Sequence, residues 1–113
     1  MSDAPGLGEF EQLVLLAILR LEAGAHAPAV RAAIEAAADR RVTRSALYST
    51  LDRLEAKQYL SWRPEPGDGP RGGIPRRCFE LTPAGLAALR RSYGAVAALA
   101  SGLEGRLGSA SSR

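Results

Sequence analysis

The chain has 113 residues, a formal net charge of +3, and 46% hydrophobic residues. This length allows one domain with a modest core, and the single cysteine excludes both an intrachain disulfide and a metal site built from several cysteines. The apolar run at residues 13–19 is far shorter than the roughly 20 residues that cross a bilayer, and acidic residues precede it, so we expect a cytoplasmic protein that does not enter a membrane.

The charge is distributed unevenly along the chain. Residues 1–40 contain three Lys and Arg against six Asp and Glu, which gives a formal charge of −3. Residues 41–113 contain twelve bases against six acids, which gives +6. A basic segment of this kind favours a polyanionic partner, although proteins without such a partner can show the same imbalance.

Two helices are expected in the acidic part. Residues 1–6 are small and polar, so we expect them to be disordered. Apolar residues recur at helical spacing over residues 9–21, and Leu16 and Leu19 make the rest of that surface apolar as well. Such a helix needs cover on more than one side, in part from a second chain. A proline in the first turn and a short apolar stripe predict another helix over residues 28–38.

The stretch VTRSALYSTLDRLEAKQYL, residues 42–60, predicts the third helix. Thr43 suits the N-cap, and Val42 with Leu47 stand at the positions of a hydrophobic staple. The leucines of this stretch lie on one side, so hydroxyl, phenol and guanidinium groups face outward near the helix start. Such groups suit phosphates and base edges. The candidate DNA contacts here are Thr43, Arg44, Ser45, Tyr48 and Ser49.

Some polar residues of this helix also allow a simpler interpretation. Arg53 lies further along the helix and suits a phosphate better than a base, but it could equally belong to a solvated face with Asp52 and Glu55 as partners. Tyr48 could pack half-buried with its hydroxyl at the rim. We therefore add Arg53 to the candidate DNA contacts and keep both roles for Tyr48.

Alternating apolar and polar residues predict two short strands, at residues 60–63 and 77–81. Between them PEPGDGPRGGIP holds four prolines and four glycines in twelve residues, which is too long for a tight turn and unsuited to a helix. We interpret it as a flexible hairpin tip that carries Arg71, with Arg76 and Arg77 at its base. A basic tip favours a function in binding.

A last helix is predicted over residues 83–107, with Thr82 as N-cap and Pro83 in the first position. Its apolar residues recur in alternating steps of three and four, which is the seam of a coiled coil. A helix of about 25 residues would be about 37 Å long and would project from the small domain, so we predict a homodimer. The predicted seam comprises Leu86, Leu89, Tyr93, Val96, Ala100, Leu103 and Leu107. Residues 108–113 are expected to be a disordered tail.

The predicted order of elements is helix, helix, helix, strand, basic loop, strand and long helix. This is the order of a winged helix-turn-helix, a mainly α fold with a small β-hairpin, here over residues 7–82, with a dimerisation helix at 83–107. In such a fold the third helix enters the major groove of double-stranded DNA and the hairpin touches the neighbouring backbone.

Three segments resemble the PadR-like family of transcriptional regulators. Residues 42–60 resemble its recognition-helix pattern (S/T)xxxLYxxLxRLExxGLI, GGIPRRCFELTPAGLAAL resembles its wing strand and following helix, and LGEFEQLVLLAIL resembles its opening helix. The chain departs from the family pattern at Gln58, where a glycine is usual, and at His26, where a tyrosine is usual. The short length resembles the compact class with a single C-terminal helix.

The resemblance implies a homodimeric DNA-binding regulator, usually a repressor, sometimes relieved by a small-molecule effector near the dimer interface. It implies that residues 43–49 face the groove and that Arg71, Arg76 and Arg77 belong to the wing. An alternative function is a protein-interaction module in which the winged helix has lost DNA binding and the last helix recruits a different partner.

Catalysis and metal binding find no support in the sequence. His26 is the only histidine, and it lies in an alanine-rich turn without a motif around it, so we predict no catalytic residue, no metal and no cofactor. Cys78 is interpreted as a small apolar filler. The glycines of GDGPRGG precede a strand rather than a helix, so they lack the helix N-terminus that a phosphate-binding loop needs.

Overall fold

The computed structural model describes residues 6–67 and 73–108. The predictions made for residues 1–5 and 109–113, and the place of Arg71 at the hairpin tip, lie outside the described residues.

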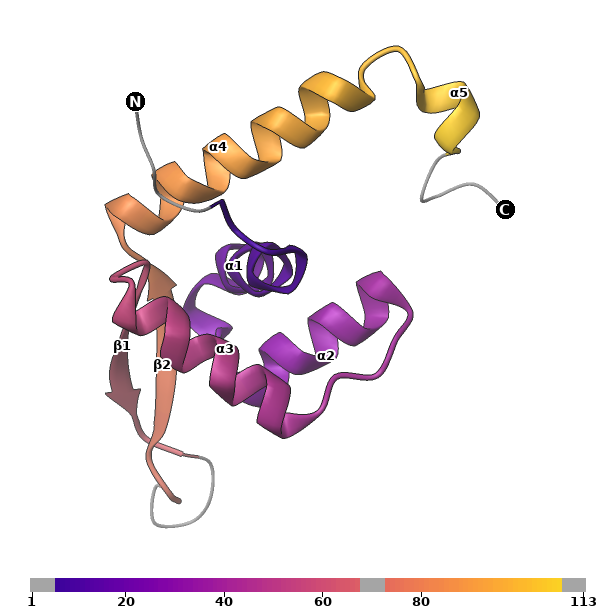
Figure 1. Cartoon of the computed structure of the whole chain (residues 1–113). Coiled ribbons are helices and arrows are strands. Elements are labelled where there is room, and N and C mark those ends of the chain that lie inside the picture. The colour runs from indigo at the N-terminus through magenta and orange to yellow at the C-terminus, as the bar shows by residue number, and fades with distance from the viewer. Residues whose placement is uncertain (1–5, 68–72, 109–113) are drawn as a thin grey trace.

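The described residues form a mainly helical fold with one small β-hairpin, as predicted (Figure 1). Three helices come first, the two strands follow, and a longer helix closes the fold. The elements are α1 (Glu9–Leu21), the short 3₁₀ helix η1 (Glu22–Gly24), α2 (Ala27–Ala38), α3 (Arg44–Ala56), β1 (Leu60–Glu65), β2 (Arg76–Leu81), α4 (Pro83–Ala100) and α5 (Glu104–Leu107).

Local signals set the starts of the helices. The Thr43 hydroxyl accepts a hydrogen bond from the Ala46 N–H at 3.0 Å, and the Thr82 hydroxyl accepts one from the Gly85 N–H at the same distance. Both residues are therefore N-caps, as predicted. Val42 and Leu47, at the positions predicted for a hydrophobic staple, are both buried in the core at the start of α3.

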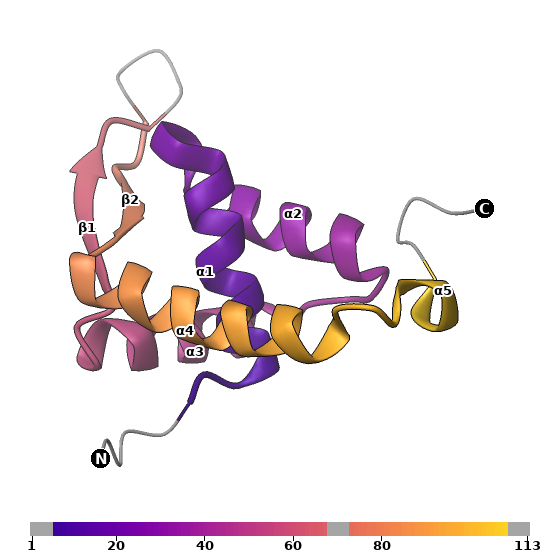
Figure 2. The ribbon, with the colours of Figure 1, turned by 90° about the horizontal axis from the view of Figure 1, so that it is seen from above.

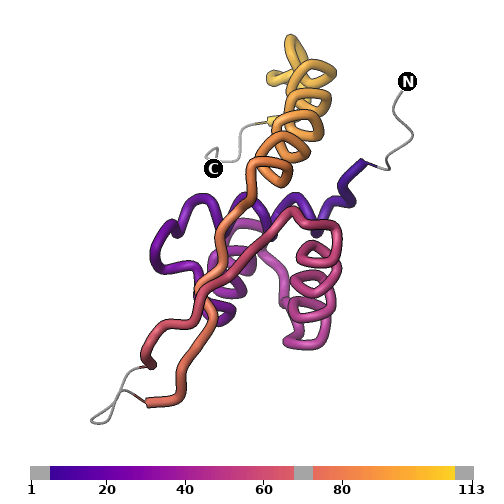
Figure 3. Tube along the Cα trace, turned by 90° about the vertical axis from the view of Figure 1, so that its left-hand side faces the viewer, coloured from indigo at the N-terminus to yellow at the C-terminus, as the bar shows by residue number. Residues whose placement is uncertain are grey.

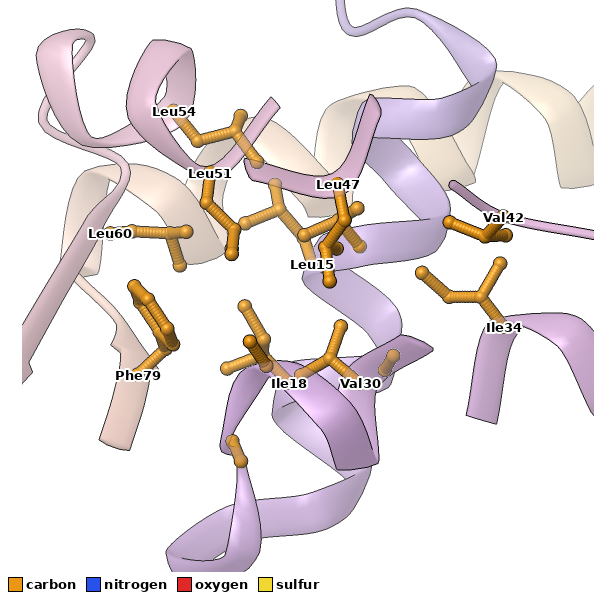
Figure 4. Packing of buried hydrophobic residues seen from close by; sticks show 14 of the residues in the cluster. Leu15, Ile18, Val30, Ile34, Val42, Leu47, Leu51, Leu54, Leu60 and Phe79 are labelled. Carbon is orange, nitrogen blue, oxygen red and sulfur yellow. The ribbon is translucent and has the colours of Figure 1, made fainter. Parts of the chain in front are cut away.

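The core lies where α1 meets α2, α3 and the hairpin. Figure 4 shows the buried side chains of these elements pointing toward one another, with Leu15 and Ile18 of α1 in the middle of the group. Burial of this apolar surface orients α3 and the hairpin against a common base. Its members include Leu15, Ile18, Val30, Ile34, Leu47, Leu51, Leu54, Leu60 and Phe79.

The two strands are antiparallel and pair from Leu60 with Leu81 to Glu65 with Arg76. They run further toward the tip than the sequence predicts. Strand β2 is also joined to the turn before α2, because the Phe79 N–H donates to the Ala25 carbonyl at 2.9 Å and His26 forms a β-bridge with Cys78. The base of the hairpin is thus fixed to the helical body on one side.

The prediction of one continuous helix over residues 83–107 is wrong. Helix α4 ends at Ala100, Ser101 is extended, and Gly102 adopts φ +86°, a left-handed conformation that glycine enters without steric cost. A four-residue helix, α5, follows, so Leu103 and Leu107 lie beyond a break in the predicted seam. The chain has left the core here, and no burial offsets the low helix propensity of glycine.

Helix α4 crosses over α1 and then extends away from the body (Figure 2). Its first turn lies close to the start of the hairpin, since a Cβ on Gly85 would stand 2.1 Å from the Tyr59 carbonyl oxygen. Figures 1 and 3 agree that α4 lies on one side of the molecule, whereas the start of α3, the end of β1 and the start of β2 lie toward the opposite side. Among the described helices, none combines the length and the apolar character that a bilayer span requires.

Candidate nucleic-acid interface

The first turns of α3 present polar side chains to solvent. Arg44, Ser45 and Ser49 are exposed, as is the capping residue Thr43, while Tyr48 is half-buried and packs against the core. These five predicted contacts therefore occupy one helix start. A helix N-terminus carries partial positive charge and free N–H groups, so the position itself favours phosphate.

Arg44 and Tyr48 form a pair on this surface. The Arg44 guanidinium carbon lies 5.6 Å from the centroid of the Tyr48 ring, within the range of a cation–π contact. The stacking leaves the N–H groups at the edge of the guanidinium able to donate to another molecule, because an aromatic face engages the cation without using its hydrogen bonds. The pair presents an ordered positive charge beside the exposed hydroxyls.

The hairpin, which we call the wing (β1, β2 and the residues that connect them), holds Arg77 against two aromatic rings. The Arg77 guanidinium lies 5.2 Å from the centroid of Trp62 and 5.6 Å from that of Phe79. Trp62 is held in turn, since its indole N–H donates to Glu55 of α3 at 3.0 Å. Arg76, the first residue of β2, is partly buried and pairs with Glu65 at the end of β1. The wing is thereby connected to α3 through side chains as well as through the chain.

Arg53 occupies a different environment from the other candidates. Its Nε donates to the Glu11 carboxylate at 3.1 Å, and Lys57 Nζ donates to the same oxygen at 2.9 Å. The partner is thus a carboxylate of α1, not the neighbouring acids of α3 that the sequence suggests. Arg53 also donates to the Thr50 hydroxyl at 3.2 Å, yet its side chain remains 52% exposed.

Glu11 is a buried carboxylate with several donors. Burial alone would raise the pKa of the Glu11 carboxyl. Hydrogen bonds from Lys57, from the Gly8 N–H and from Arg53 outweigh that effect, so the pKa lies below its ordinary value. The group is therefore ionised at neutral pH and ties the C-terminal half of α3 to the first turn of α1.

Two basic residues of the interface were missed by the sequence reasoning. Arg40 and Arg41 are exposed in the turn between α2 and α3, directly before the residues that start α3. Arg40 lies over the Phe10 ring at 5.3 Å and 3.6 Å from the Glu9 carboxylate. The adjacent arginines next to a predicted helix start were a usable signal, because they enlarge the positive surface there.

The residues of the predicted dimer seam lie in two environments. Leu89 is only 3% exposed and belongs to the chain's own core, and Leu86 is partly buried beside α1. Tyr93 and Val96 are more than half exposed, and so is Leu99, which the heptad pattern leaves out. Ala100 is partly buried at the end of α4, while Leu103 and Leu107 are exposed beyond the break. Exposed leucines of α1 add to the apolar surface: Leu16 and Leu19.

A cluster of three potential metal ligands lies where the wing meets α2. One ligand atom from each of His26, Glu65 and Cys78 lies within 4.8 Å of the others. From the sequence, His26 is a turn residue and Cys78 an apolar filler, and no sequence pattern places Glu65 beside them. The hydrogen bond with His26 and, after it, the Arg63 guanidinium keep the pKa of the Glu65 carboxyl below its ordinary value.

A three-helix body whose third helix begins on an open polar surface, followed by a two-stranded wing that holds basic residues, defines a winged helix-turn-helix protein. The family model of the transcriptional regulator PadR-like family matches residues 15–91, which is more than half of the chain. The chain therefore belongs to the PadR-like family of transcriptional regulators, a family of regulators and not of enzymes.

Solved structures agree with this assignment. A PadR-like transcription factor from Bacteroides fragilis is similar with a TM-score of 0.64 and 23% identity over 84% of this chain and 86% of that one. A PadR family transcriptional regulator from Eggerthella lenta DSM 2243 is similar with a TM-score of 0.61 and 26% identity, over 88% and 86%. A search of the curated proteins found no match.

Proposed function

We propose that the protein is a sequence-specific DNA-binding regulator that acts in the cytoplasm as a homodimer and represses transcription from an inverted-repeat operator. The main support for DNA binding is that the polar start of α3, the end of β1 and the start of β2 lie toward the same side of the molecule, opposite α4 (Figures 1 and 3). The repressor role rests on the family resemblance alone.

Helix α3 would enter the major groove with its first two turns. Ser45 and Ser49 are exposed hydroxyls that can donate to or accept from base edges, and Arg44 can donate to guanine or to a phosphate. Thr43 caps the helix through its hydroxyl and contacts the DNA backbone at the same end. Tyr48 would position Arg44 through the stacked contact and present its hydroxyl at the rim.

The wing and the turn before α3 would bind phosphates on either side of the groove. Arg77 is held on the ring of Trp62, so little rotamer entropy remains to be lost when it binds. Arg71 and Arg76 would act with it, and Arg40 and Arg41 would contact the backbone near the start of α3. Such contacts set affinity and orientation but do not read sequence.

Arg53 would be an auxiliary phosphate contact. A phosphate near Arg53 must compete with the Glu11 carboxylate, which already accepts from both Arg53 and Lys57. We therefore expect Arg53 to contribute less to DNA affinity than Arg44 does, even though both side chains carry the same charge.

Homodimerisation would use the exposed apolar side of α4. Tyr93, Val96 and Leu99 would be covered by the partner, together with Leu16 and Leu19 of α1, because these large apolar side chains are otherwise left in water. Leu103 and Leu107 would add to the contact from beyond the break. A two-fold dimer would set two α3 helices at half-sites about 34–36 Å apart, or a multiple of that distance.

An effector, if the protein responds to one as the family resemblance implies, would bind beside this interface. A cleft of about 530 Å³ lies between the end of α1, the end of β2 and the start of α4. Its walls include Ile18, Leu19, Phe79 and Leu86, so it suits an apolar molecule, and Glu22, Arg63 and Glu80 add polar groups to its lining. A ligand in this cleft would contact both the wing strand and the dimerisation helix.

The test is binding of the purified protein to its own upstream promoter duplex and to a random duplex, measured across salt concentrations. Selective binding with a steep salt dependence supports the proposal. Arg77→Ala should lower affinity for both duplexes and reduce the salt slope by about 0.9, because one phosphate contact is lost. Arg44→Ala or Ser49→Ala should reduce the preference for the promoter.

Arg91→Ala is the matched control. Arg91 is an exposed arginine of α4, and α4 lies on the opposite side of the molecule from the start of α3 (Figure 1), so its removal changes the net charge without touching the proposed DNA interface. Equal losses of DNA affinity in the Arg91→Ala and Arg77→Ala proteins would show that net charge alone explains the effect, and would contradict the proposed interface. A variant in which Arg44, Arg76 and Arg77 are all changed to Glu should no longer bind DNA. If this variant still binds DNA, the proposal fails and the protein-interaction alternative gains support.

A further inference from the structure

Three side chains that can bind a transition metal meet where the start of α2 faces the wing. His26 is the N-cap residue of α2, Glu65 is the last residue of β1, and Cys78 lies in the middle of β2. One imidazole nitrogen, one carboxylate oxygen and one sulfur lie within 4.8 Å of one another. The three residues come from separate segments, so the fold itself creates this group.

The backbone around the group is held in place by main-chain hydrogen bonds. His26 and Cys78 form an antiparallel bridge, the His26 N–H donates to the Gly24 carbonyl at 2.9 Å, and the Phe79 N–H donates to the Ala25 carbonyl at 2.9 Å. The Cα positions of two of the three ligands are therefore fixed relative to each other. A site whose backbone is set in advance needs only side-chain rotation to take a metal.

The side chains are mostly shielded from water, and their ligand atoms lie close together. His26 Nε2 lies 3.0 Å from Glu65 Oε1, and the Cys78 thiol donates to the Ala23 carbonyl at 3.2 Å. Cys78 is 1% exposed, whereas the side chains of His26 and Glu65 are 13% and 28% exposed. The second oxygen of Glu65 accepts from Arg63 at 3.1 Å, which orients the carboxylate with its first oxygen toward the imidazole.

The ligand set is typical of zinc. Zinc takes thiolate sulfur, imidazole nitrogen and carboxylate oxygen in tetrahedral geometry, with bonds of about 2.0–2.3 Å, whereas calcium and magnesium prefer oxygen alone. Such bonds place neighbouring ligand atoms roughly 3.3–3.8 Å apart, so adjustments of about 1 Å bring these three atoms to a common metal. A thiolate and a carboxylate also neutralise the two charges of the cation, and a solvent molecule can complete the tetrahedron from the partly exposed side.

We propose that His26, Glu65 and Cys78 form a binding site for Zn²⁺ or a similar divalent transition metal. Metal entry replaces the His26–Glu65 contact and the hydrogen bond from Cys78, and the thiol releases its proton to the solvent as sulfur binds the cation. The metal then joins α2 to both strands of the wing through three coordinate bonds.

The site carries a regulatory consequence that rests on the proposed DNA binding. Strand β1 contributes Glu65 next to the connecting segment of the wing, while His26 begins the helix that precedes α3. A metal that links them fixes the wing relative to α3, and a fixed wing binds phosphates with a smaller loss of entropy. Zn²⁺ should therefore strengthen promoter binding.

The first experiment is a titration of chelator-treated, reduced protein with Co²⁺, followed by displacement with Zn²⁺. The expected spectrum has a near-ultraviolet band from thiolate-to-cobalt charge transfer and intense visible bands of a tetrahedral site, both reaching their maximum at one metal per chain. A wild-type titration without the charge-transfer band would overturn the proposal, since Cys78 is the only thiol.

Variants separate a true site from incidental binding. Cys78→Ala should abolish the charge-transfer band, and Glu65→Gln should weaken Co²⁺ affinity at least tenfold while the protein keeps its circular dichroism. Glu80→Gln is the matched control, because Glu80 is an exposed carboxylate of the same hairpin that also pairs with Arg63. Equal affinities of the Glu65→Gln and Glu80→Gln proteins would exclude Glu65 as a ligand and overturn the proposed set.

Promoter binding with and without Zn²⁺ tests the regulatory step apart from the site. A tighter complex with Zn²⁺ in the wild type, and no change in Glu65→Gln, supports it. If the protein gives the cobalt spectrum but binds the promoter equally well with and without Zn²⁺, the regulatory step is overturned and the proposed metal site stands. Absence of DNA binding under both conditions overturns the proposed function, while the cobalt spectrum still decides the metal site.

Discussion

The network around Glu11 predicts a defined loss of stability when its charge is removed. Glu11→Gln keeps an oxygen that can accept from the Gly8 N–H, as in a capping box, but it removes the ion pairs with Arg53 and Lys57. Because both basic side chains remain partly exposed, each pair contributes about 0.5–1 kcal/mol after solvent screening. The expected loss is about 1–2 kcal/mol of unfolding free energy at pH 7.

Urea unfolding at fixed protein concentration measures this loss. With a slope of about 1.5 kcal/mol per M, the midpoint should fall by about 0.7–1.3 M. Glu9→Gln is the matched control, since Glu9 lies two residues away on the same helix, is 80% exposed and reaches only Arg40 at 3.6 Å. It should change stability by less than about 0.5 kcal/mol.

The pH dependence gives a second test of the same network. The folded-state pKa of Glu11 is lowered, so its contribution is fully present above the pKa of an unfolded glutamate, about 4.3, and is lost as the pH falls through the folded-state value. The gap between wild type and Glu11→Gln should be full at pH 7 and shrink below about pH 4. Equal midpoints for Glu11→Gln and Glu9→Gln at pH 7 would refute the reasoning.

Three further changes test the fold and the dimer. Gly85→Ala should lower the unfolding free energy by about 2 kcal/mol or more, because its Cβ would lie 2.1 Å from a backbone carbonyl oxygen. Gly94→Ala, with open space around it, should raise the unfolding free energy by up to about 1 kcal/mol. Calorimetry on both variants tests the two expectations. Gln58→Gly should stabilise by about 0.5–1 kcal/mol, since Gln58 has φ +65°, and a lower melting temperature would contradict this. Val96→Asp should shift the molar mass in solution from that of a dimer to that of a monomer, whereas Ala98→Asp, on the opposite side of α4, should not. Equal molar masses for the two variants would show that the side of α4 that carries Val96 is not the interface.

The sequence predicted the elements well where the signals are local. Thr43 and Thr82 cap the helices that they were expected to cap, because an N-cap and its partner lie three residues apart. Periodicity likewise identified the buried leucines of α3. The fold class and the family follow from the order of such elements, and both predictions are confirmed.

Features that depend on distant contacts were not predictable in this way. Leu89 follows the heptad pattern, but it is buried in the chain's own core, because periodicity shows that a face is apolar without showing what covers it. Arg53 has Glu11 as its partner, 42 residues away in the sequence. The candidate DNA contacts remain predictions, and their positions agree with the proposed role.

The side chains that hold Arg77 also give the protein an internal optical reporter. Trp62 is the only tryptophan, it lies in the wing, and its ring contacts a guanidinium while its N–H donates to Glu55 of α3. Any event that moves the wing relative to α3 or draws Arg77 toward a phosphate changes the polarity around one indole. The intrinsic fluorescence of the unlabelled wild-type protein should therefore follow wing movement in real time, without an added dye or a substituted residue.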